Sequence, residues 1–498
     1  MHSGPLIRLA LTLAAIGHAM ALDLPIPAPK LSPGSPAQAA VEAYRNGWLS
    51  TAVDLATPLA DKGDADGLYL LGLAKESPQP ARLSRGQAMD YSYRRAAAAG
   101  HPEAGLRRFL ISLGSNLGTE RESGRKALDE AAGANNPIAR RVWGEAWLRG
   151  FASADGKPDP KAATEWWKKA ADAGDSPSFS LLGRLYEGRF GFPEVTDYKL
   201  AMECYREAID LGDDESLLLL GELLLEENTP VYNETEGREC LRKAIGKGYV
   251  EAYLSLGDHE QNLKKSMDGA LGCFKEGADA GNARCMHRVA VLLLANDKSP
   301  AEGLQWLRKS AEAGNPEAAA ELGRRLSKED SASAVPFLLQ AAREGIPQAQ
   351  YEVGMLYLDG GIGYKDPVSA VAWLTEAMKS GDAEIQYKLG TLHERGIGCE
   401  INYANAGVLY TLACNKGHAA AAGRVAFTAS EGLGTRANPV QAHAYATLAV
   451  ERGDEGSRPL LDRLAASLTA TQKEEAAEMF QKLKGGPAGT VGAQSPGK

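Results

Sequence analysis

The chain has 498 residues, of which 44% are apolar and 24% are charged, and these fractions are typical of an ordered protein rather than a disordered one. The formal net charge of −9 argues against a general nucleic-acid binder, because such proteins carry a basic patch or stripe. Glycine accounts for 55 residues, about 11% against a usual value near 7%, and this excess predicts closely packed helices with frequent turns.

Residues 1–21 have the three parts of a secretory signal peptide. Arg8 provides the positive charge, residues 9–17 form a short apolar run, and Ala19-Met20-Ala21 is a small-x-small cleavage site. The apolar run is shorter than the roughly 18 residues that a membrane span requires. We therefore expect an exported protein, periplasmic or secreted, that does not span the membrane and whose mature chain begins at Leu22.

The segments that flank the folded part differ from it in composition. Residues 22–36 are rich in proline and predict an extended spacer. Residues 485–498 lack apolar periodicity and predict a disordered tail. Between these flanks we expect a repeat region over residues 37–464 and a cap helix over residues 465–484.

One position recurs along the chain and is glycine in every unit but one, where it is asparagine. We call it the turn position and number the other residues of a unit relative to it. The turn positions are Gly63, Gly100, Asn135, Gly174, Gly212, Gly248, Gly281, Gly314, Gly345, Gly381, Gly417 and Gly453. The eleven steps between them cover 390 residues and average 35.5 residues. A period within about 20–50 residues is the signature of a solenoid.

Each unit is predicted to contain two antiparallel helices joined at the turn position. Glycine and asparagine favour the left-handed conformation that ends a helix, and the next residue is often an N-cap, such as Asp175 or Asn315. A small residue four before the turn position and a large apolar residue eight before it, such as Trp166 or Trp306, share one helix face. A second glycine nine residues after the turn position, such as Gly183, predicts a close approach of neighbouring backbones.

Units such as residues 162–191 and 370–398 resemble Sel1-like repeats, which are relatives of tetratricopeptide repeats. They share with that family a tryptophan, an alanine and the turn glycine at fixed spacing, followed by Leu-Gly. The family's Gly-x-Gly loop occurs here as Gly361-Ile362-Gly363 and Gly396-Ile397-Gly398. The resemblance covers about residues 37–464. It implies an all-α fold, a right-handed α–α superhelical solenoid of about twelve helical hairpins.

The resemblance also implies a function. Sel1-like proteins usually assemble or regulate complexes, including envelope and exopolysaccharide systems, so we expect an exported scaffold that mediates protein–protein interaction in the cell envelope or outside the cell. One alternative is a cell-wall or β-lactam-acting enzyme of the cysteine-rich Sel1-like type, which would carry a cysteine pair in each repeat; here Cys414 stands alone, with Ala422 at its mate's position. Another is a polysaccharide-binding module, but the tryptophans fall mostly in predicted core columns.

The residues that could carry chemistry do not converge on one site. The Gly-x-Gly loops lie between helices, whereas a dinucleotide site needs a strand before the loop. The histidines are scattered, and His287, two residues after Cys285, is at a poor spacing for zinc. We therefore expect no catalytic residues, no cofactor and no metal, and the partners that we expect are proteins rather than nucleic acid.

Three of the six cysteines, Cys204, Cys240 and Cys273, lie eight residues before their turn positions. Equivalent points on stacked helices are about 8–10 Å apart, whereas a disulfide needs Cα atoms within about 7 Å, so this column should not be bonded. Cys273 and Cys285 lie on the two facing helices of one unit and are the only pair that we would consider bonded.

A basic ladder occupies the position six residues before the turn. Its members are Arg94, Lys168, Arg206, Arg242, Lys275 and Arg308. The ladder is either a stripe for an anionic partner or an ordinary solvated face. Acids four residues later, such as Asp210 and Asp279, can pair with it and favour the solvated face.

The first helices of the last units carry apolar residues where the middle units carry charge. In tetratricopeptide-like superhelices the first helices line the concave, ligand-binding face. The candidate partner-binding residues are therefore Val408, Leu412, Leu448, Arg206, Arg242, Lys275 and Arg308. The alternative is that the cap helix, which Thr469 and Gln472 open with a capping box, covers the apolar group.

Overall fold

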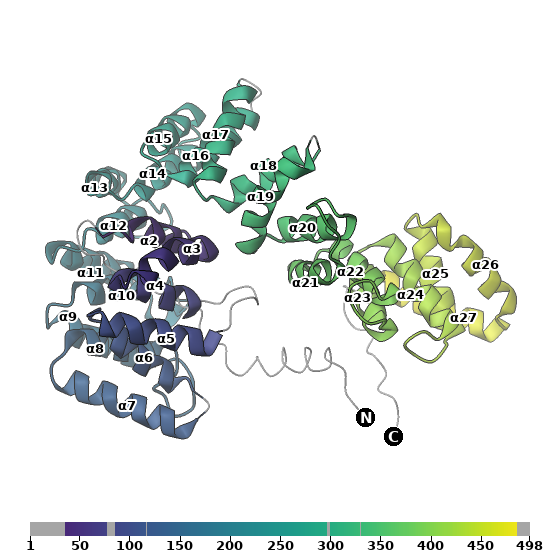
Figure 1. Cartoon of the computed structure of the whole chain (residues 1–498), viewed down its shortest axis with the longest axis horizontal. Coiled ribbons are helices and arrows are strands. Elements are labelled where there is room, and N and C mark those ends of the chain that lie inside the picture. The colour runs from purple at the N-terminus through teal and green to yellow at the C-terminus, as the bar shows by residue number, and fades with distance from the viewer. Residues whose placement is uncertain (1–34, 77–84, 116, 296–298, 329, 486–498) are drawn as a thin grey trace. The chain divides into compact units, whose positions relative to one another are not determined.

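A computed structural model of the chain describes residues 35–76, 85–115, 117–295, 299–328 and 330–485 (Figure 1). The predicted signal peptide (1–21), nearly all of the predicted spacer (22–36) and the predicted tail from residue 486 on lie outside these residues. Within them the chain forms α-helices and short 3-10 helices, with no strand. None of these helices is both long and apolar enough to cross a membrane.

The helices follow one another as hairpins, each with a first helix that ends at a turn position and a second helix that begins after it. The first helices are α3 (Leu49–Asp61), α5 (Arg85–Ala98), α7 (Gly118–Gly133), α9 (Pro160–Ala171), α11 (Tyr198–Asp210), α13 (Glu234–Gly246), α15 (Met267–Asp279), α17 (Pro300–Glu312), α19 (Ser331–Arg343), α21 (Pro367–Ala377), α23 (Tyr403–Asn415) and α25 (Pro439–Glu451). The second helices are α4 (Ala65–Glu76), α6 (Ala104–Leu113), α8 (Pro137–Leu148), α10 (Ser176–Tyr186), α12 (Glu215–Leu224), α14 (Glu251–Asn262), α16 (Ala283–Ala295), α18 (Pro316–Leu326), α20 (Pro347–Asp359), α22 (Ala383–Arg395), α24 (Ala419–Glu431) and α26 (Arg458–Ser467).

Helix α2 (Gln38–Arg45) precedes the hairpins, and helix α27 (Ala470–Gly485) follows them. Short 3-10 segments, η2 (Pro193–Val195), η3 (Met378–Ser380) and η4 (Glu455–Ser457), lie in the connections. The all-α solenoid of helical hairpins that the repeats predicted is confirmed.

The turn positions adopt the conformation that their residue types predicted. Every one of the twelve has a positive φ, between +63° at Asn135 and +100° at Gly314. Only glycine and, less readily, asparagine adopt this region without strain. The following helices are capped as expected: Asp175 accepts a hydrogen bond from the Ser178 amide (3.1 Å), and Asn315 accepts one from the Ala318 amide (2.7 Å).

Where a repeat has the second glycine, that glycine is a socket for a side chain of the next repeat. A Cβ atom added at Gly183 would lie 2.4 Å from the ring of Tyr205, and one added at Gly257 would lie 2.3 Å from the ring of Phe274. Tyr205 and Phe274 are fully buried. The close approach that the recurring glycine predicted is therefore a contact between a bare backbone and a large side chain.

Next to the predicted column eight residues before the turn position, the side chains that fill these sockets form a column seven residues before it. Its members, all at most 1% exposed, are Ala56, Tyr93, Leu128, Trp167, Tyr205, Leu241, Phe274, Leu307, Leu338, Leu374, Tyr410 and Ala446. The position eight before is buried in part of the chain only: Trp373, Leu409 and Tyr445 are 2–4% exposed, whereas Trp166 and Trp306 are only partly buried and Leu55 is 42% exposed. The two positions are neighbours in the sequence, and the side chain seven residues before the turn is the one that enters the socket at the glycine of the preceding repeat.

The chain divides into two compact units, residues 1–319 (unit 1) and residues 320–498 (unit 2). In unit 1 the N-terminal helices pack against second helices far along the chain. Arg45 of α2 pairs with Glu215 of α12 at 3.4 Å and lies 5.4 Å from the centre of the Tyr249 ring, just before α14. Ala283 of α16 belongs to the same core cluster as Trp48.

Figure 1 shows α2 to α4, in dark purple, beside α10 and α12 and inside the arc of first helices α9, α11 and α13. The second helices therefore face the interior of unit 1. The expectation that the first helices line the inner face does not hold where the N-terminal helices pack, because they contact α12, Tyr249 before α14, and α16.

In unit 2 the predicted cap helix forms as α27. Its capping box is present: the Thr469 amide donates to Gln472 Oε1 (3.0 Å), and the Gln472 amide donates to Thr469 Oγ1 (3.3 Å). Phe480 and Leu483 of α27 pack on the core cluster that contains Leu448. The cap therefore closes the apolar end of the last hairpin, as a solenoid end requires.

We expect Gly257→Ala to lower the free energy of unfolding by about 1–3 kcal/mol, because the new methyl group would overlap the Phe274 ring. The control is Gly272→Ala in the next helix. Gly272 is exposed and has no neighbouring atom within 4 Å of an added Cβ, so this change should stabilise by up to about 1 kcal/mol through helix propensity. Urea unfolding followed by circular dichroism measures both, and equal shifts in the two variants would contradict the socket.

Candidate functional site

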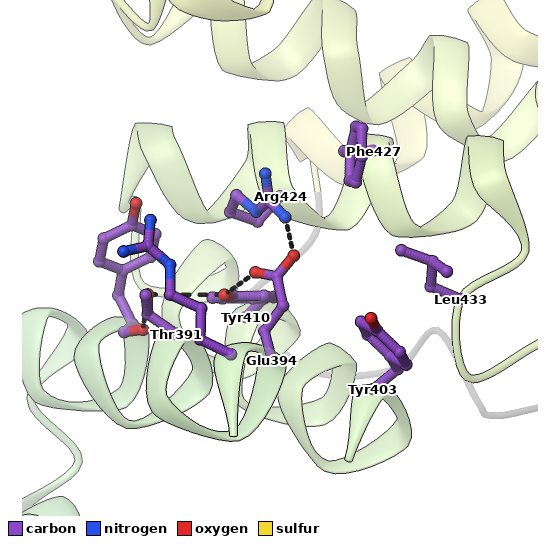
Figure 2. A pocket seen from close by; sticks show the side chains of 9 residues that line it. Thr391, Glu394, Tyr403, Tyr410, Arg424, Phe427 and Leu433 are labelled. Atoms are coloured by element: carbon purple, nitrogen blue, oxygen red, sulfur yellow. Dashed lines mark hydrogen bonds and ion pairs between the residues drawn. The ribbon is translucent and has the colours of Figure 1, made fainter. Parts of the chain in front are cut away.

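A pocket of about 450 Å³ opens in unit 2 beside the second helices α22 and α24. Figure 2 shows the side chains that line it. They are Tyr387, Thr391, Glu394 and Arg395 of α22, Tyr403 and Tyr410 of α23, Arg424 and Phe427 of α24, and Leu433 of the loop that follows. Its volume falls within the range of about 300–1,000 Å³ that is usual for ligand sites.

The repeat register sets the base of the pocket. The ring of Tyr410 fills the socket at Gly390, and its hydroxyl donates a hydrogen bond of 2.6 Å to Glu394, one helical turn after that glycine. Arg424 of the next second helix donates to the other oxygen of Glu394, and the dashed lines of Figure 2 join these three side chains. Burial raises the pKa of Tyr410, so its hydroxyl remains a donor at neutral pH.

The walls combine aromatic rings with guanidinium groups. The guanidinium of Arg424 lies 4.5 Å from the centre of the Phe427 ring, and Tyr387 stacks on His418 at 4.4 Å. Nε of Arg424 is buried and has no hydrogen-bond partner within the described part of the chain. Arg395 is exposed and makes no ion pair with any described residue. The pocket therefore offers stacking surfaces and unused cationic donors.

The lining residues are mainly aromatic rings and guanidinium groups. They include no serine, cysteine, histidine or lysine, and the one carboxylate, Glu394, is already engaged by Tyr410 and Arg424. Among the residues that the structure describes, no group of three or more His, Cys, Asp or Glu side chains is arranged to hold a metal ion.

The three apolar candidates of the C-terminal units do not form one surface. Val408 is 54% exposed and Leu412 is 42% exposed, one turn apart on α23. Leu448 is 3% exposed and lies in the core beneath α27. The placement of Leu448 on a binding surface is therefore wrong, since the cap helix covers it, whereas the cap leaves Val408 and Leu412 exposed.

The basic ladder is partly neutralised, although by other acids than predicted. Arg206 pairs with Glu236 at 2.6 Å, and Lys275 pairs with Glu302 at 3.0 Å; both acids lie on the first helix of the next unit. Exposed pairs of this kind contribute at most about 1 kcal/mol.

Two other ladder members, Arg242 and Arg308, are exposed and form no ion pair among the described residues. The ladder lies on first helices. A partner role for Arg206, Arg242, Lys275 and Arg308 stays a prediction.

All six cysteines are free, including the pair considered for a disulfide. Cys285 is fully buried in the core cluster around Phe274, whereas Cys273 is half-buried and packs on the neighbouring cluster around Leu241. The two thiols pack in different clusters, so the disulfide that the sequence left open between them does not form in this structure.

Sequence reasoning missed the pocket altogether. Its signal is a combination of positions across two successive units: glycine at +9 and glutamate at +13 in one, then tyrosine at −7 and arginine at +7 in the next. Each position alone is an ordinary helical residue. Only the column at −7, which was placed one residue away, would have linked them.

The family model for the Sel1 repeat matches residues 144–175, 180–213, 214–249, 283–315, 347–382, 383–418 and 419–454. The last two of these repeats contain every residue of the pocket. No curated protein matches the sequence.

Similar solved structures include a protective antigen present in uropathogenic Escherichia coli strains, described as displaying an SLR fold. It is 23% identical, the match covers 90% of this chain and 99% of the antigen, and the TM-score is 0.47. A Sel1 repeat protein from Oxalobacter formigenes is 22% identical over 61% of this chain and 91% of its own, with a TM-score of 0.40. An immunity protein from Pseudomonas aeruginosa is 20% identical over 38% and 75% of the two chains, with a TM-score of 0.23.

We expect the denatured, non-reduced protein to release six thiols in a titration with Ellman's reagent, because the structure leaves every cysteine unpaired. Peptide mapping by mass spectrometry should recover Cys273 and Cys285 in separate peptides. Four thiols together with a peptide that links these two residues would overturn the assignment.

Proposed function

Because this chain belongs to the Sel1-repeat family, we propose that it is an exported scaffold that binds a protein partner through the pocket of unit 2. Sel1 repeats are suited to protein–protein interaction, and the family is typically non-catalytic. The observation that carries the proposal is the pocket itself, which combines aromatic walls with the unpartnered Nε of Arg424 and with Arg395, which makes no ion pair among the described residues. Such residues are enriched at the centres of protein interfaces.

Export to the periplasm or beyond rests on residues 1–21, with their charge, apolar run and Ala19-Met20-Ala21 site. In that compartment the scaffold would serve assembly or regulation of envelope or exopolysaccharide systems. The exposed pair Val408 and Leu412 lies on the same helix as Tyr403 and Tyr410 of the pocket and is a second contact region for the same partner.

We expect the chain expressed in its own host to begin at Leu22, since signal peptidase cleaves after a small-x-small motif. N-terminal sequencing of the protein from the periplasmic or extracellular fraction measures this. An intact Met1 in a cytosolic fraction would contradict export without bearing on the pocket.

We expect Thr391→Trp to reduce recovery of the partner at least tenfold in cross-linking from the host envelope fraction, because the indole would fill the pocket. The control is Thr375→Trp on α21. Both hydroxyls donate to a backbone carbonyl one turn earlier, Thr391 to Tyr387 (3.0 Å) and Thr375 to Val371 (2.7 Å), but Thr375 lies outside the pocket and off α23.

Leu412→Asp separates the two contact regions. Loss of the partner in this variant, with an unchanged melting temperature, would add the exposed face of α23 to the interface. Full recovery of the partner by Thr391→Trp would show that the pocket is not the binding site.

A further inference from the structure

The pocket of unit 2 is one of two copies of the same set of side chains. Five residues occupy the same repeat positions in one pair of successive repeats of unit 1 and in one pair of unit 2. They are Tyr69, Glu76, Tyr93, His101 and Arg107 in unit 1, and Tyr387, Glu394, Tyr410, His418 and Arg424 in unit 2.

The contacts within the two copies match as well. The tyrosine at +6 stacks on the histidine at +1 of the next repeat. The two ring centres are 3.8 Å apart in unit 1 and 4.4 Å apart in unit 2. The tyrosine at −7 donates to the glutamate, at 2.7 Å and 2.6 Å. The arginine at +7 pairs with the same glutamate in both copies.

The copy in unit 1 is closed by a second carboxylate. Glu145 lies on α8, the second helix of the next hairpin, and accepts a hydrogen bond from Arg107 Nη2 at 2.9 Å. Arg107 therefore lies between two acids and is 1% exposed. Arg149 of α8 then pairs with both acids, with Glu76 at 3.3 Å and with Glu145 at 2.7 Å. Two arginines and two glutamates balance one another, as a buried charge requires.

The copy in unit 2 lacks that second acid. The residue at the repeat position of Glu145 is Arg463, ten residues after its turn position, and it pairs instead with Glu431 at 2.9 Å. Arg424 pairs with one carboxylate only, that of Glu394. Its side chain is 33% exposed and lines the open pocket. Of the charged groups in this pocket, two are arginines and one is a glutamate, so the set carries one uncompensated positive charge.

We propose that the pocket of unit 2 binds an acidic side chain of the partner protein, whose carboxylate pairs with Arg424 in the way that Glu145 pairs with Arg107 in unit 1. The inference rests on the proposed function and names the chemistry of the partner. Arg395, at the same pocket and without an ion pair, supplies a second donor. An apolar or aromatic residue next to the acid would lie against Tyr403, Phe427 and Leu433. Charge-assisted bonds of this kind are about twice as strong as neutral ones.

The test uses the mature full-length chain and two acetylated, amidated peptides, Gly-Ser-Glu-Phe-Ser-Gly and its match with Gln in place of Glu. Fluorescence anisotropy of labelled peptides should give at least tenfold tighter binding for the Glu peptide. Free glutamate is the third probe: binding as tight as that of the Glu peptide would make the ligand a small molecule rather than a protein segment and would overturn the proposal.

Variants locate the preference. Arg424→Lys keeps a charge for Glu394 but loses the planar fork, and Arg395→Gln removes the exposed donor; each should reduce the Glu-to-Gln preference at least threefold. Arg458→Gln is the control, because Arg458 is an exposed arginine of α26 that pairs only with Glu455 among the described residues. Thermal unfolding by circular dichroism should show that all three variants remain folded.

Equal binding of the two peptides, or binding of neither, would show that the proposal is wrong. The same holds for a Glu preference that survives in both pocket variants. The proposed function would still stand in these cases if Thr391→Trp abolished cross-linking to the partner, because that result depends on the pocket and not on the charge of what enters it.

Discussion

The contact between a bare glycine backbone and a large side chain of the next hairpin is the interaction on which the rest of the structure depends. A glycine in the middle of a helix costs about 1 kcal/mol relative to alanine. The ring or branched chain that enters its socket is fully buried, as at Gly183 with Tyr205, and burial of such a side chain contributes about 1.5–3 kcal/mol. The gain exceeds the cost wherever the socket occurs, and the contact also fixes the distance between the second helix of one hairpin and the first helix of the next.

The socket determines where polar groups meet as well. A glutamate one turn after the glycine lies beside the hydroxyl end of a tyrosine in the socket. This pairing occurs between Tyr93 and Glu76, between Tyr205 and Glu187 at 2.5 Å, and between Tyr410 and Glu394. The same packing rule thus builds a buried ion network in unit 1 and the base of an open pocket in unit 2, and the difference between the two lies in the residues that the following helix provides.

Much of the fold could be predicted from the sequence because its signals are local. The left-handed turn positions, the N-caps such as Asn315 and the capping box at Thr469 each depend on a few neighbouring residues. The column at −7 was placed one residue away because positions −8 and −7 are adjacent on a helix and carry similar apolar residues. Only the direction of the neighbouring helix separates them.

The candidate site could not be predicted for a related reason. Arg206 pairs with Glu236 of the next unit rather than with the acid one turn away, and Leu448 is buried by a helix that comes later in the chain. Both depend on the rotation between stacked hairpins, which no single repeat specifies. The pocket in turn depends on an acid that is absent from α26, and such an absence has meaning only when two copies of the set are compared in space.

The packing of the N-terminal helices α2 and α3 against α12, the start of α14 and α16 has a consequence for how unit 1 folds. A simple solenoid has contacts between neighbours only, so it can nucleate anywhere and loosen from its ends. The pair between Arg45 and Glu215 joins residues 170 positions apart. Contacts between residues so far apart in the sequence slow folding, because a long loop must close first. The N-terminal hairpin therefore completes its packing only after most of unit 1 has been synthesised, and the ends of this unit gain the cooperativity that an open array of repeats lacks.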